Sequence, residues 1–297
     1  MAAWSSEASS MFFALRANAK NEVRSSRGAL ETIANQRKFA GAAQKAKAVR
    51  DLALVGRGFA EIWRNGWESA DEAGAQLLAA ADTAIQDAMS LDAELDSGNT
   101  GSRDYYPLWK RAYVDRYRAR SAAGSGGWAA MLQGSLHSYQ AALDAQGVTP
   151  HARRSILADH AETLVYMGAA SAAVAMIESA LEGGHHNDRN WHVWALAFAL
   201  HHAGEPDRAV AELEAVFKDS NTDDLWNNDM RLMLAAAHQA SGGHLRAVEL
   251  MQKFTQVQAA MGERVWTLAL EIERGAFQPG STLEAAWQDT LADAGLA

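Results

Sequence analysis

The chain of 297 residues contains no cysteine, so neither disulfide bonds nor thiolate chemistry can contribute to its structure or function. It also has only four prolines, and many of its stretches are rich in alanine. Both features favour helix over strand, because proline interrupts helices and alanine is the strongest helix former. Few segments show the period-2 alternation that a half-buried strand needs. We therefore predict an all-α protein.

Long apolar runs are also missing. No stretch of about 18 apolar residues occurs, so we expect no membrane-spanning helix. The apolar run at residues 11–15 is too short for the core of a secretory signal, and Arg16 follows it directly. Together with the lack of cysteine, these features favour a cytoplasmic location.

The net charge of −9 is unevenly distributed along the chain. Residues 1–66 hold eleven Lys and Arg against five Asp and Glu, which leaves sixteen basic and 31 acidic residues for the rest. A basic segment can be an arm for an anionic partner, or it can pack against the acidic body of its own chain. We favour the second interpretation, because eleven charges spread over 66 residues make no dense cluster.

The chain divides by composition into two helical parts. Residues 1–97 are expected to form helices without a repeat, with Gly28 and Gly41 as candidate breaks. Residues 98–103 are polar, contain glycine and lack large apolar side chains, so we predict a linker there. Residues 104–297 are assigned to a second helical domain that ends in capping helices. Within it, Thr149 and Pro150 are predicted as the N-cap and first residue of a helix.

Three stretches of the second part repeat one pattern: 155–181, 191–217 and 229–255. Each is predicted to be a helix, a glycine-bearing turn and a second helix. The turn glycines, and the alanines that follow each of them by five residues, are Gly168, Gly204, Gly242 and Ala173, Ala209, Ala247. The alanines are 36 and 38 residues apart. Self-similarity at such a period predicts stacked helical hairpins.

The middle stretch resembles a tetratricopeptide repeat. Leu196 and Ala197 match the first-helix positions of that family, Gly204 matches its turn, and Ala209 matches the small residue of its second helix. The resemblance covers about a third of the chain, with spacings above the ~34 residues of the regular repeat. It implies a superhelical stack of α-hairpins with a concave groove lined by the first helices. Another kind of α-hairpin array remains the alternative.

The resemblance also implies which side chains line the groove. An aromatic stripe with polar neighbours suits recognition, because aromatic rings supply large contact area and His or Glu can fix orientation. The alternative is that the stripe packs against a neighbouring helix as core. The implied groove residues are Trp191, Trp194, Phe198, His201, His202, Glu162, Tyr166 and Asp229.

Two other chemistries receive less support from the residues. All ten histidines lie between His137 and His244, but their spacing fits no closed zinc pattern, so we expect neither a metal site nor a cofactor. Residues 103–120 interleave aromatic and basic side chains, as single-strand nucleic-acid sites do. The same spacing is typical of an amphipathic helix with a solvated charged face, and the acidic body of the chain argues against a nucleic-acid partner.

We therefore predict a non-enzymatic protein–protein interaction module that binds a peptide or partner protein in an aromatic groove. One alternative is a structural subunit of a homo-oligomer that assembles through its N-terminal helices. Another is a helical enzyme or small-ligand protein that uses the histidine-rich region.

Overall fold

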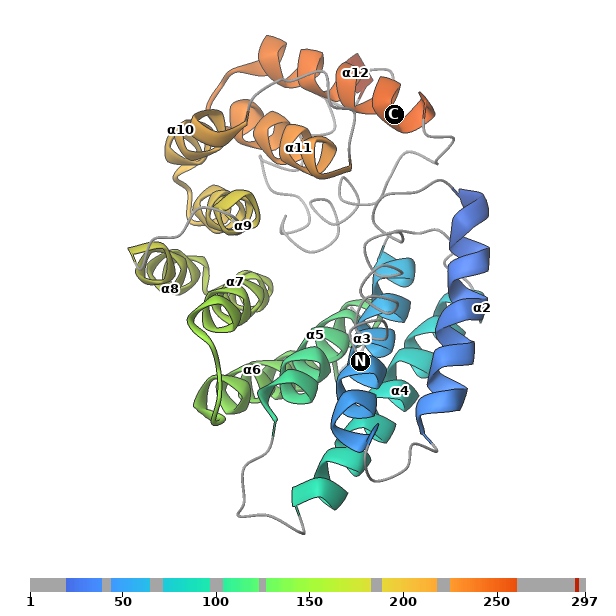
Figure 1. Cartoon of the computed structure of the whole chain (residues 1–297). Coiled ribbons are helices and arrows are strands. Elements are labelled where there is room, and N and C mark those ends of the chain that lie inside the picture. Colours follow the sequence, from blue (N-terminus) through green and yellow to red (C-terminus); the bar gives the residue numbers. More distant parts are fainter. Residues whose placement is uncertain are drawn as a thin grey trace. The chain divides into compact units, whose positions relative to one another are not determined.

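The computed structural model of the chain describes residues 20–38, 44–64, 72–96, 104–122, 127–182, 189–217, 225–260 and 292–293. Within these residues every regular element is a helix, so the predicted all-α class is confirmed for them (Figure 1). The chain forms two compact units, residues 1–152 and 153–297. No helix in the described part is both long enough and apolar enough to cross a membrane.

The helices of the first unit are α2 (Lys20–Arg37), α3 (Lys45–Arg64), α4 (Glu72–Asp96), α5 (Tyr105–Ser121) and α6 (Trp128–Asp144). Gly28 lies inside α2, so it is not the helix break that the sequence predicted. A single glycine lowers helix stability by only about 1 kcal/mol, and the residues around Gly28 are compatible with a helix. Gly41 and the predicted linker at 98–103 lie outside the described residues.

Helix α7 (Pro150–Tyr166) crosses the boundary between the units in sequence. Its first three residues belong to the first unit and its other residues to the second. The backbone N–H of Ala152 donates a hydrogen bond of 3.1 Å to Thr149 Oγ1, so the predicted N-cap is confirmed. The helices that follow are α8 (Ala170–Glu182), α9 (Arg189–His202), α10 (Pro206–Val216), α11 (Leu225–Ala240) and α12 (His244–Ala260). The predicted capping helices between 262 and 291 lie outside the described residues.

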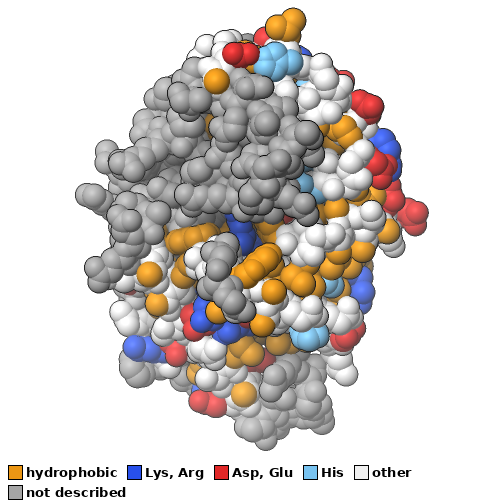
Figure 2. Space-filling view, turned by 180° about the vertical axis from the view of Figure 1, so that it is seen from behind, with side chains coloured by type: hydrophobic (Ala, Val, Ile, Leu, Met, Phe, Trp, Pro, Cys, Tyr) orange, Lys and Arg blue, Asp and Glu red, His pale blue; other side chains and the backbone are white. Residues whose placement is uncertain are grey.

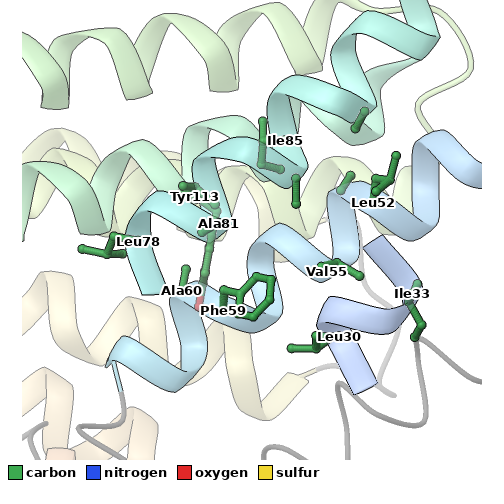
Figure 3. Packing of buried hydrophobic residues seen from close by; sticks show 14 of the residues in the cluster. Leu30, Ile33, Leu52, Val55, Phe59, Ala60, Leu78, Ala81, Ile85 and Tyr113 are labelled. Atoms are coloured by element: carbon green, nitrogen blue, oxygen red, sulfur yellow. The ribbon is translucent and has the colours of Figure 1, made fainter. Parts of the chain in front are cut away.

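Helix α3 is the central element of the first unit, where it packs against α2, α4 and α5. Its residues Leu52, Val55 and Phe59 recur at helical spacing and form one buried face. Figure 3 shows this face together with the side chains that surround it, which come from α2, α4 and α5. These neighbours include Leu30, Ile33, Leu78, Ala81, Ile85 and Tyr113.

The basic residues of the N-terminal part are paired inside the first unit. Arg37 donates a buried hydrogen bond of 2.9 Å to Asp51, and Arg50 donates one of 3.0 Å to Asp104. Further ion pairs join Lys45 to Glu94, Lys47 to Asp51 and Arg57 to Glu61. Lys45 and Arg50 pair with carboxylates beyond residue 66, so the predicted packing of the basic segment against the acidic body of the chain is seen for these two cations. The other three pair with carboxylates of the basic segment itself. Figure 2 shows basic and acidic side chains next to one another on the described part of the molecular face that it presents.

In the second unit, helices that are neighbours in sequence pack together from α8 to α12, and α9 also packs against α11. Three of the connecting turns share one geometry. Gly168, Gly204 and Gly242 have φ values of 80°, 79° and 85°, in the left-handed region where glycine is favoured. Each turn has the two hydrogen bonds of a glycine C-cap, such as Gly204 N–H to the carbonyl of His201 and Glu205 N–H to that of Leu200.

The alanines five residues after these glycines have a common role. The amides of Ala173, Ala209 and Ala247 donate the first hydrogen bond of the second helix, to the residue that follows the glycine. All three side chains are fully buried. The glycine-to-alanine spacing therefore fixes where one helix ends and where the next one begins.

Gly56 provides a test of the packing of α3 against α4. A Cβ at this position would lie 2.7 Å from Ile85 Cγ1 and 3.0 Å from the carbonyl oxygen of Ala81. We expect Gly56→Ala to lower the free energy of unfolding by about 1–3 kcal/mol, because the two helices would have to separate. Urea unfolding followed by circular dichroism measures this loss.

Gly28→Ala is the matched control, since a Cβ at Gly28 would meet no atom within 4 Å. It is expected to raise stability by about 0.5–1 kcal/mol through helix propensity. Equal effects of the two substitutions would contradict the close approach of α3 and α4.

Candidate functional site

Four aromatic and imidazole rings link α7 to α9 in the second unit. The rings of Trp194 and Phe198 stack with centroids 5.4 Å apart and an interplanar angle of 8°. Phe198 also meets the Tyr166 ring of α7 at 5.9 Å and the edge of His202 at 4.6 Å. We call Tyr166, Trp194, Phe198 and His202 the aromatic cluster.

Polar groups border the aromatic cluster on both helices. The Tyr166 hydroxyl lies 3.5 Å from Glu162 Oε1, one helical turn away on α7. The imidazole of His201 meets that of His202 with centroids 4.9 Å apart and the planes nearly perpendicular. The helices thus bring together six of the eight residues that the sequence assigned to a groove. The side chains of the other two, Trp191 and Asp229, lie outside the described part.

The side chains assigned to the groove are more buried than the lining of an open groove would be. Trp194, Phe198 and His201 are each 2% exposed, and Glu162 is 1% exposed, while His202 is half-buried. The sequence left open whether the stripe lines a groove or packs as core, and in this structure its rings pack against one another. A ligand that contacts Trp194 or Phe198 must therefore displace the atoms that cover them.

Burial also determines the charge of the imidazoles. It lowers the pKa of His201 to about 4, and it lowers the pKa of His160 on α7. Desolvation is the cause at both sites, because a low-dielectric environment disfavours the protonated ring. Both side chains are therefore neutral at pH 7 and can accept as well as donate a hydrogen bond.

Several buried polar residues of the second unit were not assigned to the groove by the sequence analysis. Asp159 and His160 on α7, His192 on α9 and Arg231 on α11 are all buried. Asp159 could have been found, because Asp159, Glu162 and Tyr166 follow one another at i, i+3 and i+7 and so share a helix face. No comparable signal marks Arg231, whose burial depends on the helices around α11.

Helix α5, the other candidate site, differs from the amphipathic helix that the sequence predicted. Lys110 is 1% exposed and Arg116 is 0% exposed, so the expectation of a solvated charged face is wrong for these two residues. The Arg116 guanidinium lies 4.8 Å and 5.0 Å from the ring centroids of Tyr113 and Tyr117. Cation–π attraction and the long apolar stems make this burial tolerable.

Two more cations of α5, Arg111 and Arg118, are engaged by carboxylates of the first unit. Arg111 and Arg118 each lie 2.9 Å from Asp82 Oδ1, and both also pair with Asp115. Since Asp82 and Asp115 neutralise Arg111 and Arg118, these two cations offer little free charge for binding phosphate.

Metal ligation receives no geometric support in the described residues, which contain no group of three or more His, Cys, Asp or Glu side chains arranged to hold an ion. Two adjacent histidines, His185 and His186, and the nearby Asp188 lie outside the described residues. Comparison with known proteins adds no assignment: no protein-family model matches the sequence. No curated protein matches it either.

The packing of Phe198 can be tested by truncation. We expect Phe198→Ala to lower the unfolding free energy of the second unit by about 3–5 kcal/mol, because the ring contacts Tyr166, Trp194 and His202. Phe198→Leu, which retains most of the volume, should cost clearly less. Urea unfolding fitted with one transition for each compact unit gives both values. A loss below about 1 kcal/mol for the alanine variant would show that the ring is not packed.

Proposed function

We propose that the second unit is a tetratricopeptide-like stack of α-hairpins that binds a segment of a partner protein. In this proposal the binding face is formed by the first helices of successive hairpins, α7, α9 and α11. The observation that carries the proposal is the position of the aromatic cluster, which lies on α7 and α9 rather than on the second helices.

Two further observations support a repeated arrangement. The turns at Gly168, Gly204 and Gly242 have the same backbone conformation and hydrogen bonds, so the hairpins share one local geometry. Contacts also occur between like helices of neighbouring hairpins. α9 packs against α11, and Arg208 of α10 pairs with Glu178 of α8 at 2.6 Å. In an array of hairpins, each unit stacks on its neighbour through such contacts.

The chemistry of the face suits a peptide. Aromatic rings supply most of the binding energy at protein interfaces, and a few polar groups fix the register of the bound chain. Here Glu162 can accept hydrogen bonds, while the neutral His201 can both donate and accept. Because the rings are buried, binding requires the face to open, and His202 is the half-buried member through which contact begins.

A displayed library of random peptides, screened against the full-length chain, tests this proposal. We expect peptides that bind in the micromolar range, and His202→Ala should weaken them by roughly 5- to 30-fold, as loss of an interface residue worth about 1–2 kcal/mol does. Isothermal titration calorimetry measures the affinities, and circular dichroism checks that the variant remains folded.

Arg208→Ala serves as the matched control, because Arg208 is exposed on the second helix α10 and its ion pair with Glu178 is a surface one. It should leave peptide affinity unchanged. The proposal fails if no peptide binds the wild-type chain. It also fails if Arg208→Ala weakens binding as much as His202→Ala does.

A further inference from the structure

The residues that form the proposed binding face are buried together with several imidazoles. His201 is 2% exposed, and His160 and His192 are also buried. His201 directly precedes His202, whose ring contacts both His201 and Phe198. A change at His201 therefore acts directly on His202 and, through His202, on Phe198.

We propose that this arrangement is an acid-triggered device, in which proton uptake by His201 opens the packing of α9 and exposes Trp194 and Phe198. The opening itself is independent of the proposed function. That the exposed rings then admit a partner segment rests on the proposed function.

The direction of the effect follows from proton linkage. The pKa of His201 is lowered from 6.5 to about 4 by burial, so the closed helix holds fewer protons than an opened one between these values. The closed state keeps its full stability above pH 6.5 and loses it progressively as the pH falls towards 4. For this pair of pKa values, the ratio of opened to closed molecules rises about 20-fold between pH 7 and pH 5.

Other titratable groups lie on α9 and on the helices that contact it. α9 itself carries His192 and His202. The neighbouring helices contribute Asp159, His160, Glu162 and Tyr166 from α7, Glu178 from α8, Glu205, Arg208 and Glu214 from the start and body of α10, and Arg231 and His238 from α11. Among these, Glu178 and Glu205 pair with Arg208, and Glu214 pairs with His238.

The surrounding groups do not reverse the predicted direction. Burial is the cause of the lowered pKa of His201, and it favours the neutral ring in the closed molecule. His160 has its pKa lowered in the same way, so its protonation adds to the effect. All of the other groups are present both in the wild-type chain and in a His201 variant, so comparison of the two tests the contribution of His201.

The absence of cysteine makes the opening measurable, since one introduced thiol is the only one in the chain. Ala197 on α9 and Ala53 on α3 are both fully buried, so Ala197→Cys reports on the device and Ala53→Cys serves as the control in the first unit. The full-length chain is treated with a dipyridyl disulfide, which remains reactive in acid. Each rate is divided by that of the denatured protein at the same pH.

The normalised rate for Ala197→Cys is expected to rise about 20-fold from pH 7 to pH 5. In the double variant with His201→Gln the rise should be less than about threefold, and Ala53→Cys should show none. The device is refuted if His201→Gln leaves the rise intact, if no rise occurs, or if Ala53→Cys rises in parallel, which indicates general acid unfolding.

A second measurement covers the case in which His201→Gln does not fold. This measurement is NMR spectroscopy of the wild-type chain labelled with ¹³C-histidine. In the closed molecule the ring signal of His201 should keep the chemical shift of a neutral imidazole down to about pH 5. A native His201 that takes up its proton near pH 6.5 without exposure of Ala197→Cys would overturn the proposal. Neither experiment contains a peptide, so their failure is distinct from a failure of the proposed function.

Discussion

The arrangement of the second unit depends on one backbone constraint, the left-handed glycine that ends each first helix. At Gly168, Gly204 and Gly242 the positive φ turns the chain, and two hydrogen bonds satisfy the last carbonyl groups of the helix. The next helix begins at the following residue, so the direction of the second helix is determined by the glycine. A side chain with a Cβ would adopt this conformation at a cost of about 1–2 kcal/mol. The fully buried alanines five residues later then let the second helix pack closely.

Once the hairpins have this shape, the first helices come into contact and bury what they carry. The stacked rings of Trp194 and Phe198 meet Tyr166 across the α7–α9 contact, and Glu162 and His201 are buried beside them. Burying such polar groups costs free energy unless they form hydrogen bonds, and the Tyr166 hydroxyl lies 3.5 Å from Glu162 Oε1. In the proposed function this composition serves recognition, and in the proposed acid-triggered opening His201 links access to the face with pH.

The sequence predicted the local features well, because they depend on local chemistry. The turn glycines and the spacing of Trp194 and Phe198 follow from backbone conformation and helical period. Features that depend on a third helix were not predictable. Gly56 is required by the approach of α4, and the Tyr113 hydroxyl donates to Glu61, 52 residues away in sequence. Lys110 and Arg116 are buried, contrary to the expectation of a solvated face. Aromatic rings of α5 form cation–π contacts with both side chains, which makes their burial tolerable. The assignment of residues to a groove was only partly accessible from the sequence. Periodicity placed the residues on one helix face, but it carried no information about what covers that face.

The central claim is that the first helices of the second unit form the recognition surface. Hydrogen–deuterium exchange of the full-length chain, with and without a selected peptide at saturating concentration, tests it most directly. The account predicts that the peptide slows exchange at the amides of α7 and α9 and leaves α8 and α10 unchanged. Protection confined to α8 and α10, or to the helices of the first unit, would contradict it.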